Sequence, residues 1–208
     1  ELLANLTEQR QMSAPDKQTA APPAAPVCGA DSWMPTPARI LGIRQQNFNT
    51  FTYRLQIVDQ SLRGRFRFTP GQFNMIYVPG VGEAAISISS DCDNTEVLEH
   101  TIRVVGSVTR AIDRAARPGG SGLVGIRGPF HRGWPVEQIA GHDVVLVAGG
   151  IGLAPLRPMI SWLLVNRSRV GRLVLLFGCR TPEDRLFVDE LDNWSRQFDV
   201  LVTVDNAT

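Results

Sequence analysis

The first half of the chain alternates apolar and polar positions in short runs. Residues 51–58 (FTYRLQIV) follow this alternation most strictly, so every second side chain falls on one face of a strand. That face carries four large side chains, Phe51, Tyr53, Leu55 and Ile57. Turns rich in proline, glycine, aspartate and asparagine lead to three further expected strands, at 72–78, 85–89 and 97–105. With one helical stretch at 108–116, this pattern predicts a small antiparallel β-barrel over residues 36–135.

The pattern changes after residue 143. The runs at 144–148, 173–177 and 200–204 are continuously apolar, which is typical of strands buried on both faces. Two segments with helical spacing lie between them, one carrying Leu156, Met159, Ile160, Leu163 and Leu164, the other Leu186, Phe187, Glu190, Leu191 and Trp194. This order predicts a parallel α/β domain over residues 136–208. Because it stops after a third strand, we expect the domain to be incomplete and its C-terminal part to be truncated in this sequence.

The N-terminal residues 1–35 have a different composition. A short possible helix (LLANLTEQRQM) is followed by a stretch rich in proline and alanine that cannot build a core. We interpret residues 1–35 as an extension or linker, which could lie on a partner subunit.

Composition excludes several classes of function. The chain has 21 basic and 20 acidic residues in 208, so no strong field attracts nucleic acid or a membrane surface. No apolar run approaches the roughly 18 residues needed to cross a bilayer. Its cysteines, Cys28, Cys92 and Cys179, form no CxxC pair. We therefore expect reduced thiols, a cytoplasmic location and no metal centre within this chain.

A glycine-rich turn follows the first apolar strand of the second half. In AGGIGLAP, Gly149, Gly150 and Gly152 let the backbone turn sharply and bring its N–H groups close to a phosphate. Pro155 suits the first turn of the helix that follows, where no N–H is needed. The usual third glycine of a dinucleotide fingerprint is absent, and the next strand ends in Gly178-Cys179-Arg180 instead of an acidic residue. A tight turn that binds nothing is the alternative interpretation.

Six motifs occur in an order and spacing that resemble the ferredoxin–NADP reductase superfamily. They are PGQF (70–73), ISISS (86–90), RVVGSVT (103–109), GPF (128–130), GGIGLAP (149–155) and LLFGCRTPEDRLFVDEL (175–191). Within the superfamily, the chain is most similar to the gamma subunits of soluble NAD(P)-linked nickel–iron hydrogenases, also called sulfhydrogenases. Electron-transfer subunits of dihydroorotate dehydrogenase and of anaerobic sulfite reductase are similar too.

The resemblance implies an FAD site on the barrel. Ser87 matches the family serine that hydrogen-bonds near the flavin N5, which makes it the catalytic candidate, and Ile86 stands where a tyrosine usually packs on the flavin. The family arginine that holds the FAD pyrophosphate would fall at Ala84, so Arg103 and the helix start at Gly106 are expected to replace it. The full set expected at FAD is Ile86, Ser87, Ile88, Ser89, Arg103, Val104, Val105, Gly106, Ser107 and Thr109. Ordinary strand and helix-cap roles remain the alternative for the serines and for Thr109.

The resemblance also implies an NAD(P) site on the parallel domain. It would comprise Gly149, Gly150, Ile151, Gly152, Ala154, Pro155, Gly178 and Arg180. Arg180 could hold a 2′-phosphate, which slightly favours NADPH over NADH.

The implied function is that of a diaphorase subunit in a hetero-oligomer, such as a hydrogenase. Hydride would pass between NAD(P)H and FAD, and single electrons would reach iron–sulfur clusters in partner subunits. The resemblance further implies a [2Fe–2S] cluster beyond the C-terminal end of this sequence. Two alternatives stay open: the same role beside dihydroorotate dehydrogenase or sulfite reductase, and a structural subunit that has lost its flavin.

Overall fold

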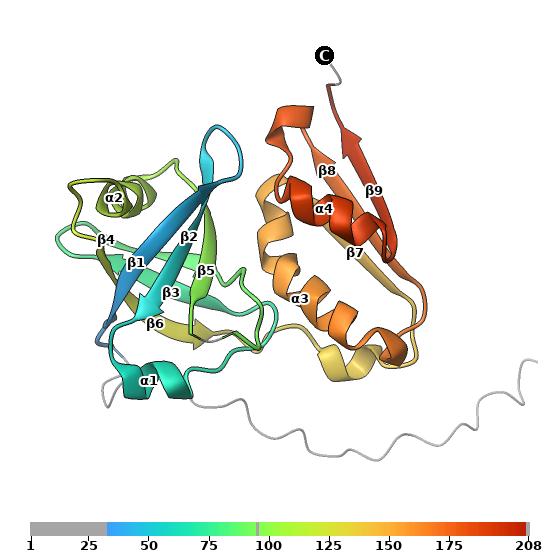
Figure 1. Cartoon of the computed structure of the whole chain (residues 1–208), viewed down its shortest axis with the longest axis horizontal. Helices are drawn as coiled ribbons and strands as arrows, with labels where there is room; N and C mark the ends of the chain where they lie inside the picture. The colour runs from blue at the N-terminus through green and yellow to red at the C-terminus, as the bar shows by residue number, and fades with distance from the viewer. Residues whose placement is uncertain (1–32, 95, 207–208) are drawn as a thin grey trace, which may run out of the picture.

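A computed structural model describes residues 33–94 and 96–206, and Figure 1 shows that they form two units side by side, each built on its own sheet. Most of the predicted extension (1–35), with Cys28, lies outside the described residues. The predicted fold class, an antiparallel β-barrel followed by a parallel α/β domain, is confirmed.

The first unit is a six-stranded antiparallel sheet that curves back on itself. Its strands are β1 (Thr36–Gln45), β2 (Thr50–Ile57), β3 (Phe73–Val78), β4 (Gly82–Ser87), β5 (Leu98–Arg103) and β6 (Leu123–Phe130). They lie in the order β4-β3-β6-β1-β2-β5. Beyond the end of β4, the Ser89 N–H donates to the Glu99 carbonyl at 2.8 Å, which brings the two outer strands together. This curvature is why we call the sheet a barrel.

The face of 51–58 predicted to be buried does line the barrel core. Phe51, Tyr53, Leu55 and Ile57 are at most 9% exposed. Helix α2 (Ser107–Ala116) closes part of the barrel with the buried side chains of Ala111, Ile112 and Ala115. A second helix, α1 (Gln60–Arg65), was not predicted; the carboxylate of Asp59 caps it by accepting from the N–H groups of Ser61 and Leu62.

The second unit is a parallel sheet in the order β7-β8-β9. Its elements are β7 (Val144–Gly149), α3 (Leu153–Val165), β8 (Leu173–Cys179), α4 (Val188–Ser195) and β9 (Asp199–Val204), with 3-10 turns at Val136–Ile139, Gly150–Gly152, Arg167–Arg169 and Pro182–Asp184. The buried sides of the strands pack with both helices in one core that is separate from the barrel core. Leu186 and Phe187 belong to this core but precede α4 instead of lying within it.

The prediction that the three parallel strands are buried on both faces is wrong for the described residues. Both α3 and α4 pack on the face of the sheet toward the barrel (Figure 1). On the other face Val145 is 59% exposed, Val147 is 69% exposed and Leu201 is 56% exposed. A continuous apolar run shows which positions can be buried, but only the packed helices decide which face is covered.

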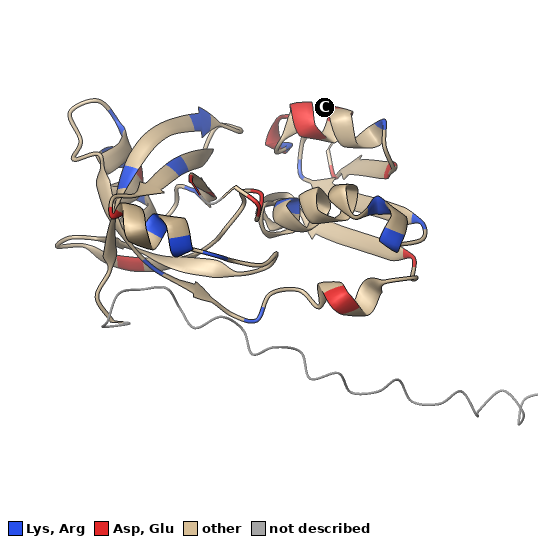
Figure 2. Ribbon diagram, turned by 60° about the horizontal axis from the view of Figure 1, so that its bottom comes forward, with Lys and Arg blue, Asp and Glu red and all other residues tan. Residues whose placement is uncertain are grey.

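Charge is spread over both units. Figure 2 shows basic and acidic positions scattered over the barrel and the parallel domain. Among the described residues, no helix is both long enough and apolar enough to span a bilayer.

Candidate functional site

A cleft of about 520 Å³ lies where the two units meet. One wall is the β1–β2 hairpin and the end of β5; the other is formed by the carboxyl ends of the parallel strands, where ligands bind in open α/β sheets. The lining residues are Phe48, Asn49, Arg103, Gly149, Gly150, Ile151, Gly178, Cys179, Arg180, Asp184 and Asp205. Five of the residues expected at the pyridine nucleotide, Gly149, Gly150, Ile151, Gly178 and Arg180, are thus together in one cleft.

The glycine turn has the geometry that its sequence requires. Gly150 has a φ of +50°, a left-handed conformation that favours glycine. Helix α3 begins directly after this turn without a side-chain cap, and the N–H of its first residue, Leu153, donates to the Gly150 and Ile151 carbonyls. Pro155 occupies the first turn of α3, as expected, and Ala154 is buried beneath it. Such a helix start favours an anionic group.

Arg103 connects the barrel with this turn. It ends β5, and its Nη2 lies 3.4 Å from the point that a Cβ on Gly150 would occupy. Its Nε is buried without a hydrogen-bond partner. Of the residues expected at FAD, Arg103 is the one that lines the cleft. A buried guanidinium N–H without an acceptor is costly, and an anionic ligand would satisfy it.

At the start of α2, backbone N–H groups and not side chains are the groups available to a ligand. Thr109 Oγ1 accepts from the N–H groups of Val105 (3.1 Å) and Gly106 (2.9 Å) and lies 3.2 Å from the Gly106 carbonyl. Its hydroxyl therefore caps the helix, which was the alternative interpretation of this residue. The N–H of Ser107 and its first-turn neighbours have no intrahelical acceptor and remain available to a phosphate.

The strand that carries Ser87 is pinned from inside the barrel. The Ser87 carbonyl accepts from His100 Nδ1 at 3.0 Å, and His100 Nε2 lies 3.2 Å from Asn74 Nδ2. Because a carbonyl can only accept, the proton is on Nδ1 and the neutral ring accepts from Asn74. Burial lowers the pKa of His100 to about 4, although its bond to the Ser87 carbonyl acts in the opposite direction.

The four residues of the ISIS segment separate into two environments. Ile86 and Ser87 are partly exposed. Ile88 is fully buried in the barrel core, and Ser89 is buried with its hydroxyl 3.0 Å from Thr101 Oγ1. Their side chains thus serve the barrel core, and a ligand could reach them only through the backbone.

Several cleft residues escaped the sequence analysis. Phe48, which is 74% exposed, and Asn49 come from a hairpin with no local functional signal. Asp205 directly follows β9, and the rule that ligands bind at the carboxyl ends of parallel strands could have identified it. Asp184 lies in a 3-10 turn and had no comparable signal.

The described thiols are free and shielded. Burial raises the pKa of Cys92 to about 12, and burial also raises the pKa of Cys179, which lines the cleft. Within residues 33–94 and 96–206, no group of three His, Cys, Asp or Glu side chains is arranged to hold a metal ion.

Comparison with known proteins identifies the parallel domain. Residues 146–206 match the family model described as the oxidoreductase NAD-binding domain. The chain is 32% identical over 154 residues to the sulfhydrogenase 2 gamma subunit of Pyrococcus furiosus, an alignment that covers 74% of this chain and 52% of that protein. It is 33% identical to a probable dihydroorotate dehydrogenase B (NAD(+)) electron transfer subunit of Methanocella arvoryzae, covering 84% of this chain and 58% of that protein.

A solved structure supports the same fold. The ferredoxin NADP+ reductase of Neisseria gonorrhoeae with bound FAD and NADP superposes with a TM-score of 0.69 at 22% identity, covering 83% of this chain and 70% of that one. The chain spans about half the length of the curated relatives it matches.

Proposed function

We propose, from the premise that this chain carries a ferredoxin reductase-like NAD-binding domain and is homologous to sulfhydrogenase gamma subunits, that it acts as an FAD-dependent electron-transfer subunit. It would exchange hydride with NAD(P)(H) and pass single electrons to iron–sulfur clusters of a larger complex. The observation that carries the proposal is the cleft itself, in which Arg103 of the barrel meets the Gly149–Gly152 turn of the parallel domain.

The barrel offers groups that fit FAD. The first-turn N–H groups of α2 that lack an intrahelical acceptor, and the unpaired Nε of Arg103, suit a pyrophosphate and would compensate for the alanine at position 84. A Cβ on Gly82 would lie 3.7 Å from Val108, so the beginning of β4 lies beside the start of α2. The proposed flavin-binding strand and the proposed phosphate-binding helix are therefore neighbours.

Each group in this arrangement has a task of binding or orientation. When bound, FAD supplies the chemistry that converts hydride transfer into single-electron steps. Ser87, held by His100 through its carbonyl, would direct its hydroxyl to the flavin ring. The glycine turn and the start of α3 would hold the pyridine nucleotide phosphates across the cleft. The protein's contribution is to align the hydride donor with its acceptor, because the rate of hydride transfer depends strongly on their relative position.

The partners follow from the named relatives. Because the gamma subunit of a sulfhydrogenase and an electron transfer subunit of dihydroorotate dehydrogenase B are parts of larger enzymes, we propose hetero-oligomeric assembly for this chain. We favour a NAD(P)-linked hydrogenase complex, because the chain is 38% identical over 142 residues to the sulfhydrogenase 1 gamma subunit of Pyrococcus furiosus. The alternative is that the chain is the electron-transfer subunit of a dihydroorotate dehydrogenase. The identity of the co-purifying subunits distinguishes these two complexes.

The flavin site is tested by FAD titration of the protein with and without Arg103. We expect Arg103→Ala to raise the Kd for FAD about tenfold, since a hydrogen bond to a charged group contributes about 1.5–3 kcal/mol. Arg114→Ala is the control, because Arg114 is exposed on α2 and does not line the cleft. FAD binding is followed by flavin absorbance and fluorescence, and anaerobic bleaching by NADH or NADPH tests the reaction. A wild-type chain that binds no flavin would overturn the proposed function. Equal FAD affinity in Arg103→Ala and Arg114→Ala would exclude only Arg103 from the FAD site.

The nucleotide preference depends on three charged residues in the cleft. Arg180 follows β8 and suits a 2′-phosphate, whereas Asp184 and Asp205 repel one. We expect Arg180→Ala to lower the NADPH/NADH ratio of kcat/KM about tenfold, which equals the loss of one charge-assisted hydrogen bond. Asp205→Asn should raise the same ratio. If both variants keep the wild-type ratio, these residues do not contact the adenosine ribose.

A further inference from the structure

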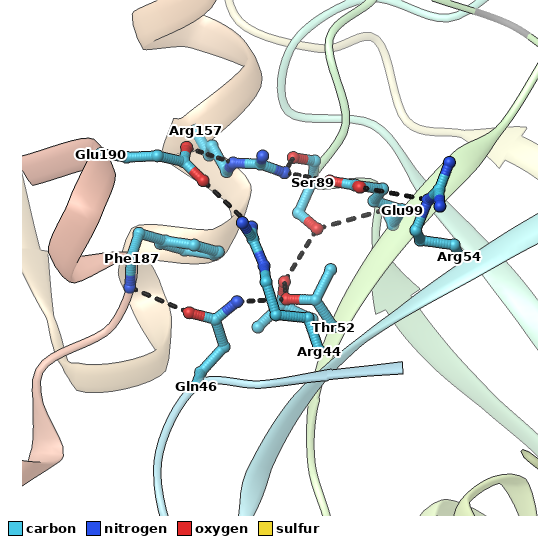
Figure 3. A network of polar contacts seen from close by, with 10 residues as sticks. Arg44, Gln46, Thr52, Arg54, Ser89, Glu99, Arg157, Phe187 and Glu190 are labelled. Atoms are coloured by element: carbon cyan, nitrogen blue, oxygen red, sulfur yellow. Dashed lines mark hydrogen bonds and ion pairs between the residues drawn. The ribbon is translucent and has the colours of Figure 1, made fainter. Parts of the chain in front are cut away.

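A single arginine of the nucleotide-binding helix joins the two units. Arg157, on α3, donates from Nη1 to Glu99 Oε2 and to the Ser89 carbonyl (2.7 Å), both in the barrel. Its Nε donates to Glu190 Oε2 on α4 at 2.6 Å. The guanidinium also lies 5.1 Å from the centre of the Phe187 ring. Figure 3 shows Arg157 between the two carboxylates, with Phe187 close by.

The β1–β2 hairpin adds a second connection at the same place. Arg44 forms an ion pair of 3.1 Å with Glu190, the carboxylate that also binds Arg157. Gln46 accepts from the Phe187 N–H at 3.0 Å and donates to Thr52 at 2.8 Å (Figure 3). This hairpin also forms one wall of the cleft through Phe48 and Asn49. The interface is therefore a polar network and not an apolar contact that could slide.

The Arg157 side chain is poorly solvated and strongly paired. It is 16% exposed, and its partners Glu99 and Glu190 are 21% and 22% exposed. Burial by itself disfavours the charged guanidinium, but the two carboxylates outweigh it and raise the pKa of Arg157. Removing the arginine would leave Glu190 with the more exposed Arg44 at 3.1 Å and Glu99 with the more exposed Arg54 at 3.9 Å. Both carboxylates would lose their least exposed cation at once, which is more costly than losing one surface ion pair.

The position of Arg157 in the chain places the network between the two predicted binding segments. Arg157 lies two residues after Pro155 of the glycine turn, and the carbonyl that it binds, that of Ser89, lies two residues after Ser87. The contact thus connects the predicted nucleotide-binding turn and the predicted flavin-binding strand through a few residues of backbone. A displacement of about 1 Å between reacting groups can reduce a rate about 100-fold.

We propose that Arg157 is a positioning residue, which fixes the distance between the nucleotide turn and the Ser87 strand by binding both units at once. Its consequence for the rate rests on the proposed function. Its consequence for the interface does not, because the contacts belong to the protein alone.

The test compares Arg157→Gln with Arg127→Gln. Arg127 is a matched control: it is 13% exposed, pairs with Glu83 and lies 5.6 Å from the Phe130 ring, but all these partners are within the barrel. We expect Arg157→Gln to slow anaerobic flavin reduction by NAD(P)H about 10- to 100-fold and to weaken the charge-transfer absorbance of the nucleotide–flavin complex, with the FAD Kd within twofold of wild type. Arg127→Gln should leave all three readouts within twofold. Arg157→Lys keeps the charge and should recover part of the rate.

Hydrogen exchange provides the readout that does not depend on a reaction. The Phe187 N–H donates across the interface to Gln46, so its exchange should accelerate in Arg157→Gln and not in Arg127→Gln. Glu99→Gln is the milder variant if Arg157→Gln does not fold. It removes the ion pair with Arg157 and the longer one with Arg54 at 3.9 Å, but it keeps an acceptor and leaves the Arg157–Glu190 pair intact. Unchanged exchange and an unchanged reduction rate in the folded variant would overturn the proposal. Faster exchange in a protein whose flavin is not reduced by either nucleotide would support the interface role and refute the proposed function instead.

Discussion

Replacing Gly150 by valine is expected to weaken NAD(P)H binding about 100-fold without loss of FAD. The φ of +50° at this residue costs an L side chain about 1–2 kcal/mol, and more for a β-branched one. Its Cβ would also meet the guanidinium of Arg103 at 3.4 Å and so occupy the cleft wall. The strain lowers the stability of the fold. The loss of one backbone hydrogen bond to a charged phosphate, about 1.5–3 kcal/mol, together with the side chain at the cleft wall, weakens binding about 100-fold. Isothermal titration with NADH and NADPH measures the change.

A second glycine, Gly141, provides a control that distinguishes the effect of backbone strain from the effect of a side chain that occupies the cleft. Gly141 has a φ of +78°, and a Cβ there would meet nothing within 4 Å. Gly141→Val should therefore lower thermal stability in the same way as Gly150→Val but leave nucleotide affinity unchanged. Equal nucleotide affinity in Gly150→Val and wild type would show that the turn does not hold the nucleotide.

Acidification is expected to destabilise the barrel through His100. Its pKa is about 4 in the folded chain, whereas an unperturbed histidine has a pKa of 6.5. Between pH 6.5 and pH 4 the unfolded chain binds a proton that the folded chain does not, so the free energy of unfolding falls as the pH falls. The full loss is about 3 kcal/mol, reached below pH 4, and nothing is lost above pH 6.5.

The contribution of His100 is isolated by comparing its glutamine variant with wild type. His100→Gln cannot titrate, while its amide can still donate to the Ser87 carbonyl and accept from Asn74. Urea unfolding at several pH values gives the free energy of unfolding as a function of pH. Between pH 4 and 6.5 this free energy should change less steeply with pH in His100→Gln than in wild type. His142→Gln, at an exposed position, should keep the wild-type slope. Parallel slopes in all three proteins would mean that His100 is not the group responsible.

Local patterns in the sequence were sufficient for most of the elements and for one half of the candidate site. The alternation at 51–58 identified a buried face correctly, because a strand repeats every two residues and burial follows that repeat. The order of apolar runs and helical segments identified the parallel sheet, and AGGIGLAP identified the turn, since only glycine adopts the φ found at Gly150 without strain. Strand β1, with Pro37 and a register shift between Ile40 and Gly42, lacked a regular pattern and was not predicted.

Contacts between distant residues were decided only by the tertiary structure. No pattern places Arg103 against Gly150, or Arg157 against Ser89 and Glu190, because these pairs are far apart in the chain and depend on how two separate cores pack. Nor does a run of apolar residues specify which face of the parallel sheet receives the helices, so Val145 and Val147 were wrongly expected to be buried. By itself, the sequence determined what most segments form and which residues are candidates for binding phosphate. The packing of the barrel against α3 and α4 determined which of those residues share one cleft.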